Sequence, residues 1–172
     1  DMTPTYKLTL PYSKKVVTYR PFLVKEERNL LLAMESEDQE QILQAITEIL
    51  NSCVTSKKFD VNNLPIFELE YLFMNIRAKS VGEIIDVKIK DPDDGKEYVS
   101  SINIEEIKIP KFEIDSTIKV NDNFVITLDF PRFGQVMGTL KSIPKDMKHE
   151  SVAKIDMTID IISTCIKEIQ YG

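Results

Sequence analysis

Polar and apolar residues alternate over residues 6–22, and this spacing of two predicts extended strands. Residues 11–14 interrupt the alternation with Pro, Ser and Lys, so we expect a hairpin. From Leu23 onward, apolar residues recur at intervals of three and four, which is typical of amphipathic helices. Two such helices follow. Ser36 is expected to cap the second, and the short ESED segment between them predicts that they lie antiparallel.

The stretch 64–79, LPIFELEYLFMNIRAK, is apolar on nearly every side of a helix. Glu68 and Asn75, with Glu70 and Arg77 beside them, leave only a narrow polar strip. A surface helix has one apolar stripe, whereas a helix that is apolar this far round is normally packed on two sides. We therefore expect a buried core helix here.

Alternation with a period of two returns in the second half of the chain. Apolar and charged residues alternate over 83–91, and the PDDGK segment that follows predicts a turn, in which Gly95 can adopt a positive φ. A further strand is expected over 96–109, and two more would flank residues 121–123. These strands predict a small antiparallel meander with one buried face.

The last segment, residues 147–171, predicts a long helix. Its apolar residues repeat at intervals of three and four along one face: Val152, Ile155, Ile159, Ile162, Ile166 and Ile169. Such a seam is typical either of packing against the rest of the chain or of an interface, and the spacing does not separate the two. A second row, Met157, Ile161 and Cys165, widens this face. Because large apolar patches usually mark interfaces, we expect this row to contact a partner or a second copy of the chain.

Together these patterns predict an α+β fold: an N-terminal hairpin and helical half, then a small antiparallel β meander and a long C-terminal helix. The length suits a single domain over residues 1–172. Within it we expect a mainly helical half over 1–80, the meander over 81–132, and a loop with the last helix over 133–172.

Composition limits the partners. The chain carries 22 basic and 28 acidic side chains, a net charge of −6. This balance disfavours contacts with phosphates or anionic lipids, so we expect neither nucleic-acid nor membrane partners. No run approaches 18 apolar residues, and the N-terminal sequence lacks the features of a signal peptide. Cys53 and Cys165 lie in apolar helical patterns and are expected to be free thiols, so the cytoplasm is the expected compartment.

Residues that carry catalytic or metal chemistry are sparse. The single histidine, His149, supports neither a histidine-rich metal site nor a triad, and the sequence has no C-x-x-C pair and no phosphate-binding glycine motif. Asp91, Asp93 and Asp94 share the predicted turn but do not match a calcium-binding loop. We expect no enzyme activity, no catalytic residues, no metal and no cofactor.

Two stretches carry a family resemblance. Residues 18–36, TYRPFLVKEERNLLLAMES, and 59–83, FDVNNLPIFELEYLFMNIRAKSVGE, resemble the T4-type phage baseplate protein family. The likeness extends through most of residues 18–109. Its motifs consist of packing and capping residues, so they point to a fold family rather than to an active site. Members of the family often extend beyond the point where this chain ends.

The resemblance implies a small structural subunit of the baseplate hub of contractile-tailed phages. Its partners would be other hub or tail proteins, or further copies in a homo-oligomer, and it would reach the virion after assembly in the bacterial cytoplasm. The alternative is a hub assembly chaperone that is absent from the mature virion. Arg77 and Lys79, where the core helix leads into a strand, are expected either to pair with Glu68 or Glu70 or to meet an acidic partner.

Overall fold

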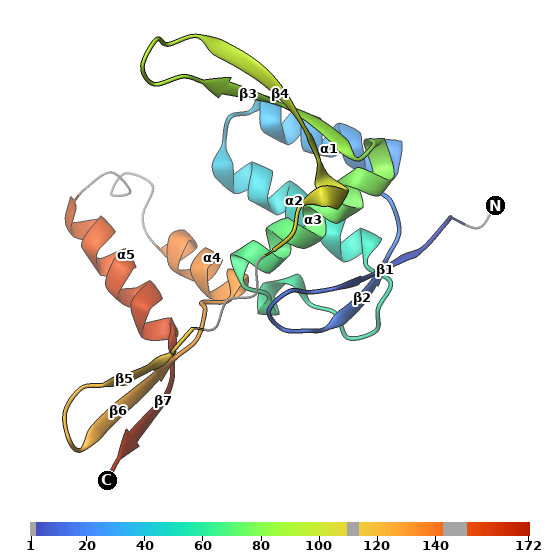
Figure 1. The fold of residues 1–172 in the computed structure, drawn as a ribbon. Coiled ribbons are helices and arrows are strands. Elements are labelled where there is room, and N and C mark those ends of the chain that lie inside the picture. Colours follow the sequence, from blue (N-terminus) through green and yellow to red (C-terminus); the bar gives the residue numbers. More distant parts are fainter. Residues whose placement is uncertain (1–2, 110–113, 143–150) are drawn as a thin grey trace. The chain divides into compact units, whose positions relative to one another are not determined.

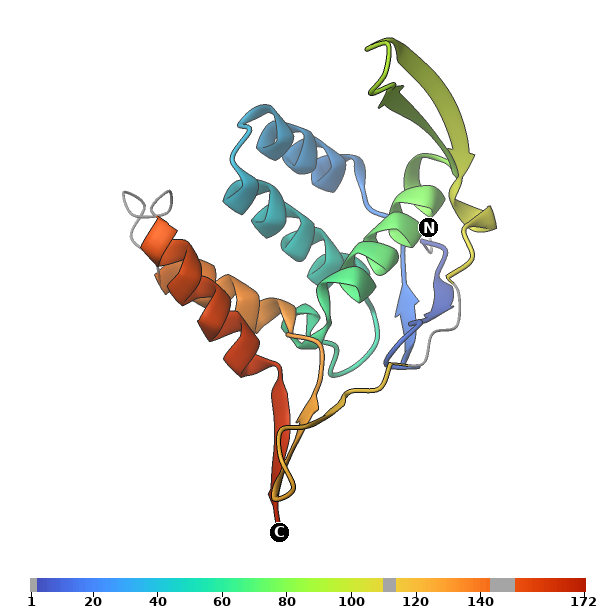
Figure 2. The ribbon, with the colours of Figure 1, turned by 60° about the vertical axis from the view of Figure 1, so that its left-hand side comes forward.

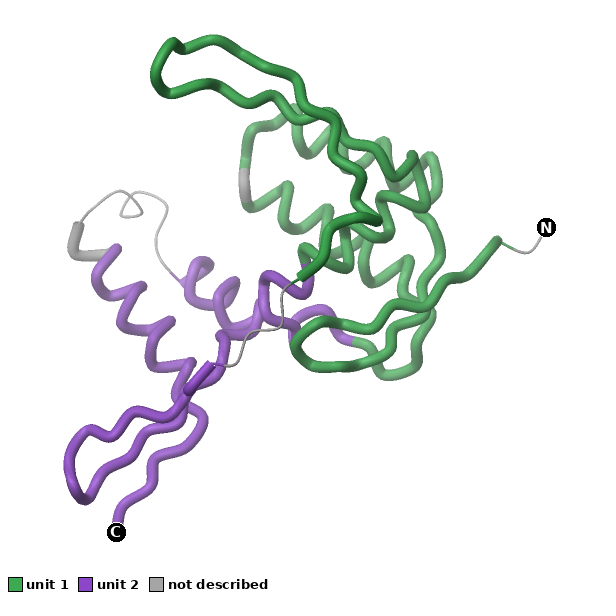
Figure 3. The backbone as a smooth tube through the Cα atoms, viewed as in Figure 1, with its two compact units in different colours: residues 1–59, 70–109 green, residues 60–69, 110–172 purple. Residues whose placement is uncertain are grey.

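The computed structural model describes residues 3–109, 114–142 and 151–172 (Figure 1). This part of the chain contains five α-helices and three small antiparallel sheets, so the predicted α+β class is confirmed. Contacts divide the chain into two compact units (Figure 3). Unit 1 comprises Asp1–Phe59 and Glu70–Ile109, and unit 2 comprises Asp60–Leu69 and Pro110–Gly172. Whether the whole chain folds as a single domain stays a prediction.

Unit 1 begins with the predicted hairpin. Strands β1 (Tyr6–Thr9) and β2 (Val16–Tyr19) pair antiparallel, with Tyr6 opposite Tyr19. The amide of Arg20 donates to the carbonyl of Cys53, so the hairpin is bonded to the end of the second helix. Val17 and Tyr19 are buried on the side of the hairpin that faces the core.

Helices α1 (Val24–Glu35) and α2 (Gln39–Cys53) run antiparallel, as the short link predicts (Figure 2). The expected cap at Ser36 is wrong. The side chain of Asp38 caps α2 by accepting from the amide of Glu40, whereas Ser36 lies at the C-terminal end of α1, where its hydroxyl donates to the carbonyl of Ala33. Helix α2 buries Ile49, Leu50 and Cys53, whereas none of the described residues of α1 is buried.

Helix α3 (Ile66–Val81) is the expected core helix. The carbonyl of Pro65 accepts from the amides of Glu68 and Leu69 in the first turn, and Gly82, at a φ of +113°, ends the helix in a conformation that suits glycine. Its buried side chains are Glu68, Leu69, Leu72, Ile76 and Ala78. Glu68 was expected on an outward polar strip, so its burial corrects that part of the prediction.

Strands β3 (Ile84–Lys90) and β4 (Glu97–Asn103) form a separate two-stranded hairpin, followed by the 3₁₀ turn η2 (Ile104–Glu106). The predicted turn is confirmed, since Gly95 has a φ of +71° and the amide of Asp91 donates to the carbonyl of Lys96. The carboxylates of Asp91 and Asp94 accept from turn amides. These acidic side chains therefore have a structural part in the turn.

Unit 2 contains β5 (Thr117–Lys119), β6 (Phe124–Leu128), α4 (Phe133–Ser142), α5 (Ser151–Thr164) and β7 (Ile166–Tyr171). The strands form one sheet in the order β5-β6-β7. The 3₁₀ turn η1 (Val61–Asn63) packs against α4, where a Cβ on Gly134 would lie 2.9 Å from the Cβ of Asn62. The rings of Phe67 and Phe130 meet edge to face, with centroids 4.9 Å apart.

The long C-terminal helix over 147–171 is wrong. Helix α5 ends at Thr164, and the last residues form β7, which pairs with β6. Ile166, Ile169 and Tyr171 favour a strand, and bonding to the open edge of β6 outweighs the helical spacing of this segment. The four strands expected in one meander lie in two sheets for the same reason, since β6 pairs with β7 while β3 and β4 pair only with each other within the described chain.

We predict that Leu72→Ala lowers the free energy of unfolding by about 2–5 kcal/mol, because truncating a fully buried leucine removes contacts and leaves a cavity. Leu31→Ala on the exposed side of α1 is the matched control and should cost less than about 1 kcal/mol. Urea denaturation of the three proteins measures both values. Equal losses at the two positions would show that α3 is not a core helix.

Candidate interaction site

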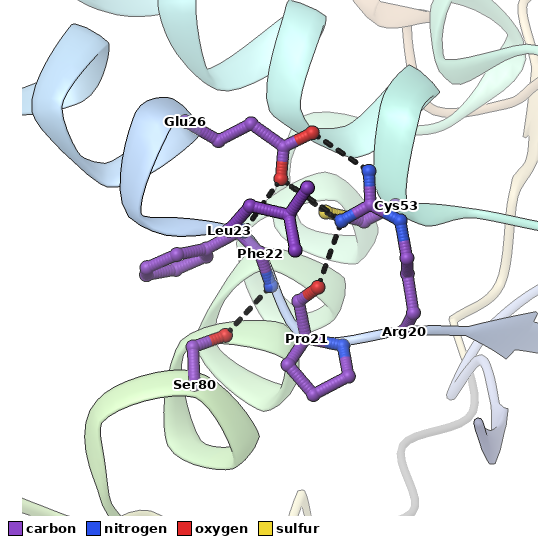
Figure 4. A network of polar contacts seen from close by, with 7 residues as sticks. All are labelled: Arg20, Pro21, Phe22, Leu23, Glu26, Cys53 and Ser80. Atoms are coloured by element: carbon purple, nitrogen blue, oxygen red, sulfur yellow. Dashed lines mark hydrogen bonds and ion pairs between the residues drawn. The ribbon is translucent and has the colours of Figure 1, made fainter. Parts of the chain in front are cut away.

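The start of α1 is held by a polar network within unit 1 (Figure 4). Arg20 binds the Glu26 carboxylate with both guanidinium nitrogens, at 2.7 and 2.9 Å. The same carboxylate accepts from the amide of Leu23, and Arg20 also donates to the carbonyl of Pro21. The RPFLVKEE segment therefore fixes how the chain leaves β2 and enters α1.

Cys53, at the end of α2, completes this network. Its thiol donates to Glu26 over 3.7 Å and lies 3.5 Å from a guanidinium nitrogen of Arg20. Burial, followed by the negative charge of Glu26, raises the pKa of the Cys53 thiol to about 12. The hydrogen bond from Arg20 holds the pKa of the Glu26 carboxyl below its usual range. A thiol with so high a pKa is a poor nucleophile, so the cluster joins three elements and provides no reactive group.

Lys79, one of the predicted site residues, forms ion pairs inside unit 1. Its ammonium group contacts Glu105, lies 3.5 Å from Glu83, and sits 5.5 Å from the ring centre of Tyr6. The hydrogen bond with Glu105 raises the pKa of Lys79. Lys79 thus pairs with glutamates that follow it in the chain, not with Glu68 or Glu70.

Arg77, the neighbouring candidate, is half-buried on α3. Its Nη1 atom is buried and makes no hydrogen bond within the described chain. A part for Arg77 or Lys79 in partner binding stays a prediction.

The C-terminal candidates lie on α5 and just after it. Met157, Ile161 and Cys165 are half-buried, and the Cys165 thiol donates to the carbonyl of Ile161. Within unit 2 the first row is open, since Ile155, Ile159 and Ile162 are 56–59% exposed, and its packing against another part of the chain stays a prediction. Partner binding by Met157, Ile161 and Cys165 stays a prediction, and the more exposed surface of α5 is the other row.

Large apolar side chains are also exposed in groups on other parts of the described chain. On α1 these are Val24, Leu31, Leu32 and Met34, and on the β3–β4 hairpin they are Ile84, Ile89, Tyr98, Val99 and Ile102. On the β5-β6-β7 sheet they are Ile118, Phe124, Ile166, Ile169 and Tyr171. The sequence analysis missed the last group, because residues 166–171 were assigned to a helix. The alternation that begins at Phe124 was the available signal.

The groove between α1 and α2 contains few side chains that could act in catalysis. An open groove of about 380 Å³ lies between α1 and α2, and its lining consists of Asn29, Leu32, Ala33, Gln41, Gln44, Ala45 and Glu48. Glu48 is the one ionisable side chain in this lining, so the groove holds no acid–base pair. Among the described residues, no cluster of three His, Cys, Asp or Glu side chains could hold a metal ion. His149 lies outside the described residues.

Within the described ranges of the chain, no helix combines the length and the apolar character needed to cross a bilayer. The described part of the chain thus has several exposed apolar faces and no cluster of catalytic or metal-binding side chains.

Comparison with known proteins gives the family. The family model described as T4 bacteriophage base plate protein matches residues 3–172, which is essentially the whole chain. The chain belongs to this family and is a phage baseplate protein, as the motifs around Arg20 and α3 indicate. Neither the curated proteins nor the solved structures gave a significant match.

We predict that Glu26→Gln costs about 1–3 kcal/mol of unfolding free energy at pH 7, because it removes the charge from a bidentate pair that also holds an amide and a thiol. The folded state lowers the pKa of Glu26, so its stabilisation is present above the unfolded value of about 4.3 and is lost as the pH falls through the folded value. The difference between wild type and variant should therefore shrink between about pH 5 and 3.

Glu27→Gln, on the same helical turn, is the control for removing one negative charge. Denaturant titrations at several pH values give the comparison. A difference for Glu26→Gln that stays constant through this acid range would contradict the ion-pair account.

The two thiols should also differ in reactivity. At pH 8 we expect iodoacetamide to modify Cys165 well before Cys53, because burial and a pKa of about 12 leave almost no thiolate at Cys53. Mass spectrometry of the native protein over time gives both rates. Faster labelling of Cys53 would mean that the network of Figure 4 is open in solution.

Proposed function

We propose that this protein is a structural subunit of the hub of a contractile phage tail baseplate and has no enzyme activity. It would act through protein–protein contacts while the baseplate assembles. The match of a phage baseplate family to residues 3–172 is the observation that carries the proposal. The hub position rests on the resemblance in the RPFLVKEE and α3 segments.

The surface of the protein supports an assembly role. Soluble monomers rarely expose large contiguous apolar patches, and such patches commonly mark interfaces. Here α1, the β3–β4 hairpin, α5 and the β5-β6-β7 sheet all expose large aliphatic or aromatic side chains. Ion pairs such as Arg20–Glu26 and Lys79–Glu105 hold parts of the fold together.

The alternative is a chaperone that helps the hub to form and then leaves. An acidic chain with open apolar faces also suits transient binding, because charge keeps the free protein soluble while the faces capture a partner. The two roles differ in whether the protein remains in the finished particle.

The test is a phage that lacks the gene, grown with and without the protein supplied from a plasmid. We expect infective particles and complete baseplates only with the protein, and quantitative mass spectrometry should find it in purified virions at a fixed copy number. Complete baseplates that need the protein but do not contain it would establish the chaperone instead. Normal baseplates without the gene product would exclude both roles.

The hub position has its own measurement. Chemical cross-linking of purified baseplates, followed by peptide mass spectrometry, should join this chain to proteins of the central hub. Cross-links only to peripheral baseplate proteins would place it elsewhere in the baseplate.

A further inference from the structure

The three-stranded sheet of unit 2 has one face built mainly from large aliphatic and aromatic side chains. Directly opposed residues of antiparallel strands share a face, so the register defines it. Ile118 lies opposite Ile126, which lies opposite Ile169, and Phe124 lies opposite Tyr171. The amide of Val120 donates to the carbonyl of Phe124, which adds Val120 to the same face. We call this set, with Leu128 and Ile166, the apolar sheet face.

A β-bulge interrupts the pairing of β6 with β7. Thr127 pairs with Glu168 but Leu128 pairs with Ile166, so Lys167 is an extra residue in β7. The bulge brings Ile166 opposite Leu128 and so adds its side chain to the apolar sheet face, which is a known use of bulges.

The described chain leaves the apolar sheet face open. Val120, Ile169 and Tyr171 are 56%, 58% and 74% exposed, and the rings of Phe124 and Tyr171 contact each other at 4.9 Å. In Figures 1 and 2 the strands extend away from α4 and α5 of the same unit. An antiparallel sheet normally buries an apolar face against a second layer.

The net charge of the sheet region indicates what packs on its apolar face. Residues 114–132 and 165–172 carry three basic and four acidic side chains, a net charge of −1, whereas the whole chain carries −6. Two of these acidic groups are already in ion pairs, Asp122 with Lys119 and Asp129 with Arg132. A second copy of this region would therefore bring together two nearly neutral surfaces with little charge repulsion between them.

We propose that the apolar sheet face is a self-association surface, on which the same face of a second copy packs to form a two-sheet sandwich. Aligned sheets pack about 10 Å apart with their strands about 30° from parallel, and two apolar faces meet well in that arrangement. The proposal follows from the register and exposure of this sheet and does not depend on a place in the hub. Because the face is small, a dissociation constant of about 1–100 µM is expected.

Sedimentation velocity of the full chain from about 1 to 500 µM, a range that brackets this constant, tests the proposal. Wild type should pass from monomer to dimer across the range. Ile169→Glu should weaken the dimer more than about 100-fold, because each dimer would bury two unpaired carboxylates. Gln170→Glu adds the same charge on the polar face of β7 and should leave the association unchanged.

A second variant covers the case in which Ile169→Glu disturbs the strand. Ile118→Thr with Ile169→Thr keeps β-branched side chains, and so strand propensity, while removing apolar contact. Its circular dichroism should match wild type, and its dimer should be weaker by at least about tenfold. A wild type that stays monomeric up to the highest concentration, a folded double variant that dimerises normally, or an equal loss in Gln170→Glu would each overturn the proposal.

Discussion

The burial of α3 is the constraint on which unit 1 depends. Leu72 and Ile76 are fully buried, and both ends of the helix are fixed, by Pro65 at its start and by Gly82 at its end. The hydroxyl of Ser80 accepts from the amide of Phe22, so the helix also holds the segment that leads into α1. The Arg20–Glu26–Cys53 network then joins that segment to α2. The hairpin is thus joined to the helices of unit 1 both through α3 and directly, by the bond from the amide of Arg20 to the carbonyl of Cys53.

Outside this core, much of the apolar surface of the chain is not buried by its own elements. The β3–β4 hairpin and the β5-β6-β7 sheet are thin layers, and isolated small sheets are marginally stable in water. Such open layers suit the proposed role, because a protein that becomes part of a large assembly can complete its layers with its neighbours. The open faces and the baseplate family thus point to the same kind of action.

Much of the fold could be predicted from spacing alone. The first hairpin, the antiparallel helix pair, the buried α3 and the turn at Gly95 all follow from local patterns. The end of the chain could not, since Ile159, Ile162, Ile166 and Ile169 fit a helix and the strand forms only because β6 offers an open edge. That long-range pairing leaves no mark in the spacing of residues 166–171.

Long-range contacts also limited what could be predicted of the candidate site. When residues 166–171 are assigned to a helix, Ile169 and Tyr171 are no longer grouped with Ile126 and Phe124. The apolar sheet face is then not recognised as one surface. Lys79 could be recognised from the sequence as a charged group at the end of α3. Its partner Glu105 follows the β3–β4 hairpin, and local sequence patterns do not predict so distant a pair. The polar network around Arg20 was visible only as a family motif, since Cys53 is 33 residues away.

The open apolar faces of this protein are expected to be covered once it is part of the baseplate. Hydroxyl-radical footprinting measures side-chain exposure directly and can compare the dilute protein with the purified baseplate. Phe124 and Tyr171 should react strongly in the dilute protein and be protected in the baseplate, while Lys57, exposed on a loop of unit 1, serves as the reference. Equal reactivity of Phe124 and Tyr171 in both states would contradict the account.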